Sequence, residues 1–549
     1  MRRRVMSMLI GAALAASTLL GTGPAAAADT PPVEFGDDWH DPITAAPPVP
    51  KPHTKSCEVT VAEAQFKDFT PYKGDYAPPA KCGKGQWGKV VLRLDGKVKG
   101  RQYDRLGYLR IGGVEVLRTS TPEPSVDGIT WSVEKDVTRY RETLSRDQQV
   151  EMLIGNVVND TYTGIIDVKA TLTFYEPVKA AKAVRAAQAP DRVIPLGDAR
   201  GSSGISGSSD GATLTTPRNS ERIVAEVYAT GSGGGCEEYW YLTVPDAAPY
   251  SCKADHGPYR EVQVKVDGRL AGIAAPFPTV WTGGWSNPFL WYVIPGPRAF
   301  DIKPVEYDLT PFAGILNDGR PHQVEVSVVG VPEARTGWST PVNVLVWQDK
   351  KSDRVTGRLT GHKESTPANT AKYTPGTGDE AHRLDTEGGH RLSVSGYVNT
   401  SHGRVATTVT RSLANTSLHR WTEGESLDAL KATWTDRETV TTGRRAVRTD
   451  RTYTMDGTTT LGAGDRLRTE ISLGDRAESV TRTGGRRTGW SVLDDRYDGD
   501  ATYTANVPRD QRHAVGTSRE RYRLTGDTGC YDRTIATAQG ILTHDHRRC

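Results

Sequence analysis

Short runs of alternating apolar and polar residues, separated by turn signals, fill residues 54–178 of the chain. The run VVLRL at residues 90–94 ends at an Asp-Gly dipeptide typical of tight hairpins, and two further runs flank Gly112-Gly113. Alternation with a period of two places one face of each segment in a core. The pattern therefore predicts a sandwich of antiparallel β-strands.

A second block with the same alternation, residues 218–350, repeats parts of the first block. VQVKVDG at residues 262–268 parallels VLRLDG at residues 91–96, and DLTPF at residues 308–312 parallels DVTRY at residues 136–140. A duplicated all-β unit of this size fits paired jelly rolls better than one large barrel. We therefore expect one jelly roll in each block.

The remaining segments differ from these blocks in composition. Residues 29–53 form a Pro-rich leader, and residues 179–217 are first Ala-rich and then Gly/Ser-rich, which is typical of a linker. Residues 351–549 are polar, rich in Thr and Arg, and indicate antiparallel strands with a large solvated face. The predicted fold class is all-β: two consecutive antiparallel jelly-roll or β-sandwich domains followed by a third β-rich C-terminal domain.

The N-terminus has the three parts of a secretion signal. Three arginines at residues 2–4 precede an apolar stretch over residues 6–20, and AAAA at residues 25–28 supplies small side chains for cleavage. The apolar stretch is shorter than the roughly 20 residues that span a bilayer, and no later segment is long and apolar enough. We expect residues 1–28 to be removed and the mature protein to be secreted, with no membrane partner.

Export places the six cysteines in an oxidising compartment, where disulfides persist. No Cys-x-x-Cys motif occurs, which disfavours a thiol nucleophile or a cysteine metal site. The cysteines fall into pairs that are close in sequence. The predicted disulfides are Cys57–Cys82, Cys236–Cys252 and Cys530–Cys549.

Charge and motifs exclude several classes of function. The net charge is +3, with both signs interspersed and no polybasic arm, which argues against nucleic acid as a partner. GKGQWGK at residues 83–89 resembles a phosphate-binding loop, but Val90 replaces the required Ser or Thr and the segment leads into a strand. Neither a zinc-protease motif nor a Gly-x-Ser-x-Gly elbow is present. No motif supports a metal site or a cofactor, although a metal or Ser-His site built from residues far apart in sequence stays open, and we expect a monomer.

Carboxylates beside aromatic residues and glycines are the remaining candidates for chemistry. Asp104 lies in QYDR, Glu123 in RTSTPEP, and Glu237 and Glu238 between a Gly-rich run and a Tyr-Trp pair. Each has a structural alternative. Asp104 could pair with a neighbouring arginine, Glu123 could be a solvated loop residue, and the other two could be ordinary strand residues. Spacing alone favours these structural alternatives.

Several motifs in collinear order resemble the peptide:N-glycosidase A family. In the first block these are QYDR at residues 102–105, LRTSTPEP at residues 117–124 and KDVT at residues 135–138. In the second block they are EYWY at residues 238–241 and GPYREV at residues 257–262. The resemblance extends over about residues 55–350 and weakens towards the C-terminus.

The resemblance implies an amidase that hydrolyses the bond between Asn and the first N-acetylglucosamine of an N-glycan. The products would be an Asp-containing peptide and a glycosylamine, and the partners would be N-glycopeptides or glycoproteins. It also implies a metal-independent enzyme built from two jelly rolls, as in the related bacterial peptide:N-glycosidase F.

The same resemblance suggests roles for individual residues. Amide hydrolysis needs an activated water, a polarised carbonyl and a proton for the departing nitrogen. Asp104 would orient or deprotonate the water, Glu238 would assist proton transfer, and Glu123 would grip the amide or the first sugar. The substrate-binding candidates are Arg105, Trp131, Glu237, Trp240, Arg260, Glu261, Trp281 and Trp285. For Arg260 a structural salt bridge is an equal alternative, and core packing is the more common fate of a tryptophan.

Both blocks supply carboxylates, so the site is expected between the two jelly rolls. One departure from the family leaves a choice open. Family members usually carry a His-Gly-type loop before the Glu-aromatic-Trp element, whereas here Cys236 and the extra acid Glu237 precede Glu238. Either glutamate could therefore be the functional one.

Two other functions remain open from the sequence. Jelly rolls are common in lectins, so the chain could bind glycans without turnover. Paired carboxylates also cleave glycosidic bonds, so it could be an endo-acting glycoside hydrolase. The product separates them, because only an amidase converts Asn to Asp.

Overall fold

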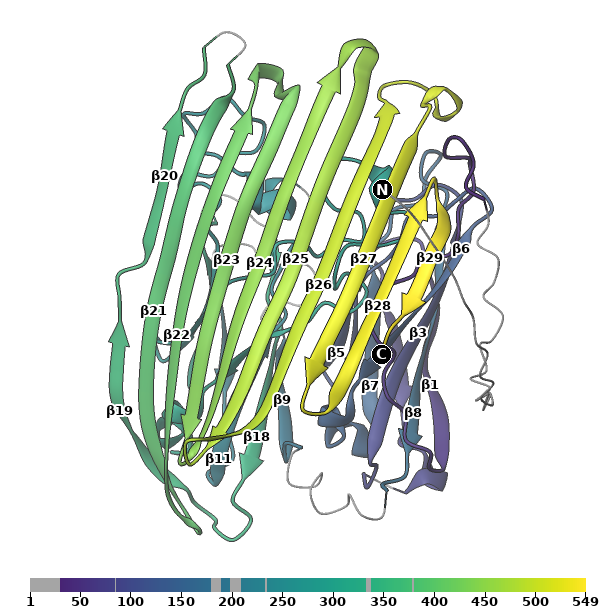
Figure 1. Cartoon of the computed structure of the whole chain (residues 1–549). Coiled ribbons are helices and arrows are strands. Elements are labelled where there is room, and N and C mark those ends of the chain that lie inside the picture. Colours follow the sequence, from purple (N-terminus) through teal and green to yellow (C-terminus); the bar gives the residue numbers. More distant parts are fainter. Residues whose placement is uncertain are drawn as a thin grey trace, which may run out of the picture.

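The computed structural model describes residues 30–83, 85–178, 189–197, 209–232, 235–331, 337–377 and 380–549. Its regular elements are almost all β-strands, which confirms the predicted all-β class (Figure 1). The predicted signal segment, residues 1–28, lies outside the described residues.

The first unit is an eight-stranded jelly roll. One sheet has the order β1-β8-β3-β6 and the other β2-β7-β4-β5, which is the strand order of a jelly roll. Side chains of β6 alternate between the core and the outside, with Ile129, Trp131 and Val133 inside. The strands are β1 (Ser56–Phe66), β2 (Tyr72–Tyr76), β3 (Lys89–Lys99), β4 (Leu106–Ile111), β5 (Val114–Ser120), β6 (Ile129–Asp136), β7 (Gln148–Ile154) and β8 (Ile165–Tyr175).

The second unit repeats this topology. Its sheets have the orders β15-β11-β18-β9 and β10-β16-β13-β14, which match the first unit when the strands are counted in chain order. A short pair, β12 (Thr230–Gly231) and β17 (Trp338–Ser339), lies apart. The helical elements used below are η5 (Cys236–Leu242), η6 (Pro288–Leu290), η7 (Thr310–Phe312) and α2 (Ala313–Leu316). The sheet strands are β9 (Arg192–Gly197), β10 (Ser209–Leu214), β11 (Ser220–Val227), β13 (Glu261–Val266), β14 (Arg269–Ala274), β15 (Val305–Asp308), β16 (His322–Val329) and β18 (Val342–Gln348).

Two of these strands correct the predicted boundaries. Both β9 and β10 lie within residues 179–217, which the composition indicated to be a linker. They are edge strands, and β9 contains Pro195, which an edge position tolerates because it has only one partner strand. Short edge strands with Pro, Gly and Ser carry little periodic signal, so composition alone misassigned them.

The C-terminal region forms one broad antiparallel sheet of 11 strands. Figure 1 shows this sheet, coloured green to yellow, lying across the two jelly rolls. Along β22 every second residue from Thr407 to Trp421 is buried, so one face packs inward and the other is more exposed, as predicted. The strands are β19 (Thr356–Glu364), β20 (Ala368–Thr374), β21 (His382–Thr400), β22 (Gly403–Trp421), β23 (Leu427–Thr442), β24 (Arg445–Gly462), β25 (Arg466–Thr483), β26 (Arg486–Thr504), β27 (Val515–Gly526), β28 (Gly529–Ala538) and β29 (Ile541–Arg547).

The Pro-rich leader is an ordered strap between the jelly rolls and this sheet. Trp39 is 5% exposed and stacks on Tyr292 with ring centroids 4.0 Å apart. The backbone N–H of Ala45 donates a hydrogen bond of 2.6 Å to the Glu520 carboxylate on β27. The leader is therefore part of the packed structure and fixes the C-terminal sheet in place.

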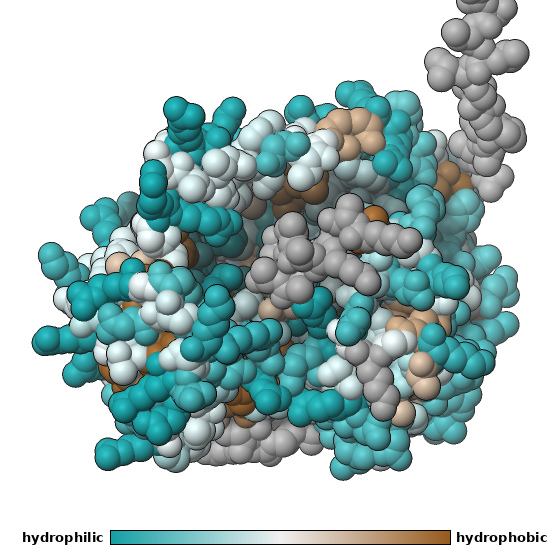
Figure 2. All heavy atoms as spheres, turned by 90° about the horizontal axis from the view of Figure 1, so that it is seen from below, coloured by the Kyte–Doolittle hydropathy of each residue, from teal (hydrophilic) through white to brown (hydrophobic). Residues whose placement is uncertain are grey.

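The structure contains the three predicted disulfides, Cys57–Cys82, Cys236–Cys252 and Cys530–Cys549. Within the described ranges, no helix has the length and apolar character needed to cross a membrane. Viewed from below, the surface is mainly hydrophilic, with apolar residues scattered in small areas (Figure 2).

Candidate active site

Asp104 and Glu123 lie at the same end of the first jelly roll. Asp104 precedes β4 and Glu123 follows β5, and these strands pair antiparallel with Leu106 opposite Ser120. The backbone N–H of Thr121 donates to the Arg105 carbonyl at 2.9 Å, which continues the pairing into the loops. Hairpin geometry thus brings together two carboxylates that are 19 positions apart in sequence.

A loop of the second jelly roll docks on this pair. The backbone N–H of Gly283 donates to Oδ2 of Asp104 at 2.9 Å, and Oγ1 of Thr282 lies 3.4 Å from the same oxygen. Thr282 is itself held by the first jelly roll, because its hydroxyl donates to the Thr121 carbonyl at 2.5 Å. Asp104 is thereby fixed by both units.

Gly283 also limits the distance between the two acids. A methyl group on its Cα would lie 3.4 Å from Oδ2 of Asp104 and 3.8 Å from Oε1 of Glu123. Because both distances run to the same point, these two oxygens are at most about 7 Å apart. Both acids therefore lie within reach of a group held beside Gly283.

Glu238 brings a third carboxylate from the second jelly roll. It lies on η5 and is partly buried, as are Asp104 and Glu123. Its negative charge contributes to raising the pKa of Asp104. The neighbouring phenol of Tyr239 has a raised pKa because it is buried and because it faces Asp104, Glu238 and Glu123. The three predicted catalytic carboxylates therefore occupy one region between the jelly rolls.

Burial and mutual repulsion change the acidity of this group. Burial raises the pKa of Asp104 to about 7, assisted by the Glu238 charge and opposed mainly by the hydrogen bond from Gly283. Burial and the Asp104 charge raise the pKa of Glu123 to about 8, opposed by nearby arginines that include Arg509. Acids with pKa values near neutrality can exchange protons with a substrate at physiological pH.

Positive charges on nearby arginines oppose the rise in the pKa of Asp104 and Glu123. Arg105 donates from Nε to Oε1 of Gln102 at 3.1 Å, and its positive charge lowers the pKa of both Asp104 and Glu123. Arg509 comes from η10 (Arg509–Gln511), in the connection between β26 and β27. The C-terminal sheet therefore contributes a charge to the site, which the sequence did not indicate.

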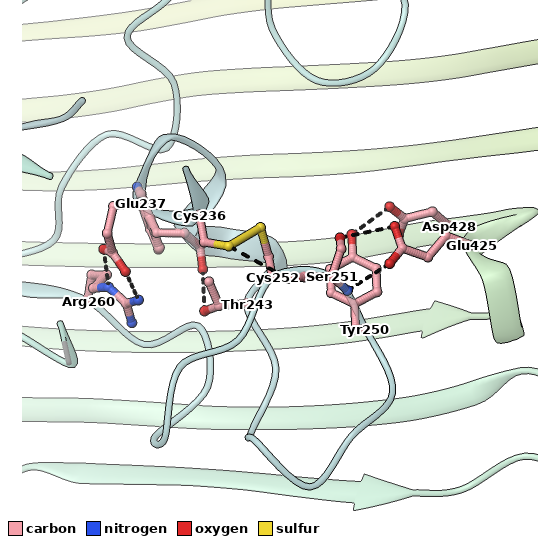
Figure 3. The surroundings of a disulfide bond; sticks show 10 residues. Cys236, Glu237, Thr243, Tyr250, Ser251, Cys252, Arg260, Glu425 and Asp428 are labelled. Atoms are coloured by element: carbon pink, nitrogen blue, oxygen red, sulfur yellow. Dashed lines mark hydrogen bonds and ion pairs between the residues drawn. A yellow bond between two sulfur atoms is a disulfide. The ribbon is translucent and has the colours of Figure 1, made fainter. Parts of the chain in front are cut away.

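Glu237 has a different environment from its neighbour Glu238. It is 2% exposed and accepts hydrogen bonds from Nε and Nη2 of Arg260 at 3.0 and 2.7 Å. Nε1 of Trp338 also donates to it, at 2.6 Å. Figure 3 shows Glu237 turned towards Arg260, next to the disulfide between Cys236 and Cys252. This geometry makes Glu237 a buried structural acid and favours Glu238 for the chemistry.

The predicted substrate contacts of Glu237, Arg260 and Glu261 need correction for the same reason. Arg260 is 1% exposed and Glu261 0% exposed. Glu261 accepts hydrogen bonds from the Tyr259 hydroxyl at 2.7 Å and from His390 at 2.8 Å. Glu261 joins the second jelly roll to β21 of the C-terminal sheet through His390, and Glu237 and Arg260 pair with each other inside the second jelly roll, so none of the three offers a surface to a ligand.

Three of the four candidate tryptophans are also core residues. Trp131, Trp240 and Trp285 are 5%, 2% and 6% exposed, so none presents a ring face to a sugar. Trp285 packs so closely on the C-terminal sheet that a methyl group on Gly457 would lie 2.3 Å from its ring. Trp281 is partly exposed beside Thr282 and remains a candidate. The sequence does not distinguish a tryptophan that packs in the core from one that binds sugar, and the burial of the side chain separates the two roles.

The structure reveals site residues that sequence reasoning missed. Thr282 and Gly283 are neighbours of the Asp104 carboxylate, and Tyr239, which the sequence places in the EYWY motif, faces all three carboxylates. Tyr103 is 47% exposed and pairs with Tyr162 at a centroid distance of 5.1 Å. Exposed tyrosines next to an acid leave no periodic signal in a sequence.

One group of possible metal ligands has donor atoms within 4.8 Å of one another in the part of the chain that the structure describes. It consists of Glu221, Asp349 and His402 and includes none of the three site carboxylates.

Comparison with known proteins identifies the family to which the chain is related. Residues 46–365, more than half of the chain, match the family described as peptide N-acetyl-beta-D-glucosaminyl asparaginase amidase A. The chain is similar to peptide-N4-(N-acetyl-beta-glucosaminyl)asparagine amidase A of Prunus dulcis, with 32% identity over 405 residues that cover 69% of this chain and 68% of the relative.

Two solved structures resemble the chain more distantly. PNGase F, a glycosylasparaginase from Flavobacterium meningosepticum, has a TM-score of 0.36 and 12% identity, covering 54% of this chain and 96% of its own. PNGF-II has a TM-score of 0.36 and 14% identity, covering 53% and 66%. Neither structure bears on the family of this chain at such identity and TM-score, and the two sequence matches establish it. The chain belongs to the peptide N-acetyl-beta-D-glucosaminyl asparaginase amidase A family and is an amide hydrolase.

Proposed function

We propose that this protein hydrolyses the amide between an Asn side chain and the innermost N-acetylglucosamine of an N-glycan. The products are a peptide with Asp in place of Asn and a glycosylamine, which then loses ammonia. The observation that carries the proposal is the meeting of Asp104, Glu123 and Glu238 between two jelly rolls, with the pKa raised for the first two.

Asp104 acts on the attacking water. Because its pKa is about 7, the Asp104 side chain is ionised in roughly half of the protein molecules at neutral pH, and the Gly283 N–H stabilises the ionised form. The carboxylate accepts a proton from water while the water oxygen bonds to the amide carbon. The amide C–N bond then breaks, and the proton that Asp104 took from the water moves to the leaving nitrogen.

Glu123 and Glu238 handle the other charges. With a pKa of about 8, Glu123 is mostly protonated at neutral pH and donates a hydrogen bond to the amide. Glu238 binds the water or the sugar and assists proton transfer to the nitrogen. Because these groups interact, their protons titrate as properties of the whole cluster.

We also propose that the protein is secreted and acts as a monomer. The N-terminal signal pattern and three disulfides support export, because disulfides persist in oxidising compartments.

A defined N-glycopeptide tests the proposal. After incubation with the mature protein, mass analysis should find the peptide with Asp in place of Asn and the released sugar with its core intact. A peptide that keeps one N-acetylglucosamine on Asn would establish a glycoside hydrolase instead, and an unchanged but bound glycopeptide would establish a lectin. Asp104→Asn, checked for folding by circular dichroism, is the control for contaminating activity.

A further inference from the structure

Exposed apolar side chains gather beside the site. Eight large apolar side chains are strongly exposed in the described residues, and four of them lie on three neighbouring loops of the first jelly roll. We call these four and Tyr162 the rim patch: Phe69 (66% exposed), Tyr103 (47%), Val157 (38%), Val158 (38%) and the partly exposed Tyr162. Contiguous exposed apolar surface marks interaction sites.

Contacts within the molecule hold the rim patch together. The ring of Phe69 lies over Gly155, where a methyl group would come within 2.6 Å of it. Nε2 of Gln102 donates to the Val157 carbonyl at 3.0 Å. These contacts tie the loops at residues 67–71, 100–105 and 155–164 to one another, so the surface is formed before a ligand arrives.

The rim patch begins one residue from the proposed catalytic base. Tyr103 directly precedes Asp104, and its ring pairs with Tyr162 at 5.1 Å. The guanidinium groups of Arg101 and Arg105 lie 5.8 and 6.0 Å from the Tyr162 ring centroid. The loop that carries Asp104 therefore also carries part of the rim patch, which places this surface beside the proposed site.

We propose that the rim patch binds the peptide on either side of the glycosylated Asn and favours apolar side chains there. This inference rests on the proposed function. Sugar sites need polar groups around a flat apolar face. The side chains of Phe69, Val157 and Val158 supply no such groups, but they match the side chains of a peptide. The two arginines add attraction for an acidic residue nearby.

The test uses two glycopeptides with the same glycan. One has Phe or Val next to the glycosylated Asn, and the other has Gly and Ser there. We expect wild-type protein to prefer the apolar peptide about tenfold in kcat/KM, the size of one side chain in a shallow apolar site. The double variant Phe69→Ser with Val158→Ser should lose this preference and keep its kcat on the Gly/Ser peptide.

A matched control separates the rim patch from general surface effects. Val178 is 44% exposed and follows β8, at the end of that strand away from the site, so Val178→Ser should keep the preference. Wild type that treats both peptides alike, or a double variant that keeps the preference, would overturn the inference. So would a double-variant defect that changes with the glycan and not with the peptide.

Failure of the proposed function gives a different result. In that case wild type converts neither peptide, and the inference is tested by fluorescence anisotropy of the two labelled glycopeptides. Tighter binding of the apolar peptide that disappears in the double variant supports it, and equal binding overturns it.

Discussion

Gly283→Ala tests whether the gap between the carboxylates is where the reaction occurs. The added methyl group would lie 3.4 Å from Asp104 and 3.8 Å from Glu123, and the carboxylates of these residues are its nearest neighbours. These are ordinary contact distances, and the φ angle of Gly283 lies outside the left-handed region. The fold should therefore accept alanine at this position.

The chemistry should not accept it. A catalytic water must lie about 2.6–3.2 Å from the group that takes its proton, and the methyl carbon would occupy space beside Oδ2 that the proposed water needs. Displacing a reacting group by about 1 Å costs on the order of 10²-fold in rate. We expect kcat to fall about 100-fold, which corresponds to about 2.7 kcal/mol.

The assay measures the rate of Asp-peptide formation at saturating glycopeptide, together with the thermal unfolding midpoint. The midpoint should change by no more than about 3 °C, since a methyl group that makes only ordinary contacts should change the unfolding free energy by about 0.5 kcal/mol or less. Gly361→Ala is the matched control, because its methyl group would make an ordinary 3.6 Å contact on the C-terminal sheet. A Gly283→Ala protein with wild-type kcat would refute the proposed position of the water.

Three further variants test the surrounding account. Glu237→Gln leaves the buried Arg260 without its charge partner and should lower the unfolding free energy, measured by denaturant titration, by about 3–5 kcal/mol. Glu238→Gln should change the unfolding free energy by less than about 1 kcal/mol but lower kcat, measured by turnover, at least about 100-fold. Because the pKa of Asp104 is about 7 in the folded state, the unfolding free energy of wild type should fall as pH rises from about 4 to about 7. The unfolding free energy of Asp104→Asn should equal that of wild type near pH 4 and exceed it by about 1–3 kcal/mol at pH 8, after allowance for solvent screening. Equal unfolding curves at pH 8 would contradict this. Trp39→Ala should cost about 3–4 kcal/mol because it removes a buried ring stacked on Tyr292, and an unchanged unfolding free energy would show that the leader is dispensable.

The two jelly rolls could be predicted because their strands alternate with a period of two and because the motif at residues 91–96 recurs at residues 262–268. The strands β9 and β10 could not, since they are short edge strands whose partners are far away in sequence. The structural role of the leader also depends on distant contacts, such as that between Ala45 and Glu520, which are 475 positions apart.

The site divides in the same way. The carboxylates could be identified from motifs, because chemistry restricts which residue types serve there. Thr282, Gly283 and Arg509 could not, because they act through position and not through a reactive group. The assignment of Trp131, Trp240 and Trp285 to sugar binding was wrong because an indole ring serves a core and a sugar site equally well, and only packing distinguishes them.

Hydrolysis in water enriched with heavy oxygen tests the central claim most directly. If water activated by the carboxylate cluster attacks the amide carbon, wild type should yield a peptide whose new Asp side chain carries one heavy oxygen atom, and Asp104→Asn should yield almost none. A peptide that still carries N-acetylglucosamine on Asn, or a labelled peptide formed at the wild-type rate by the folded Asp104→Asn variant, would contradict the account.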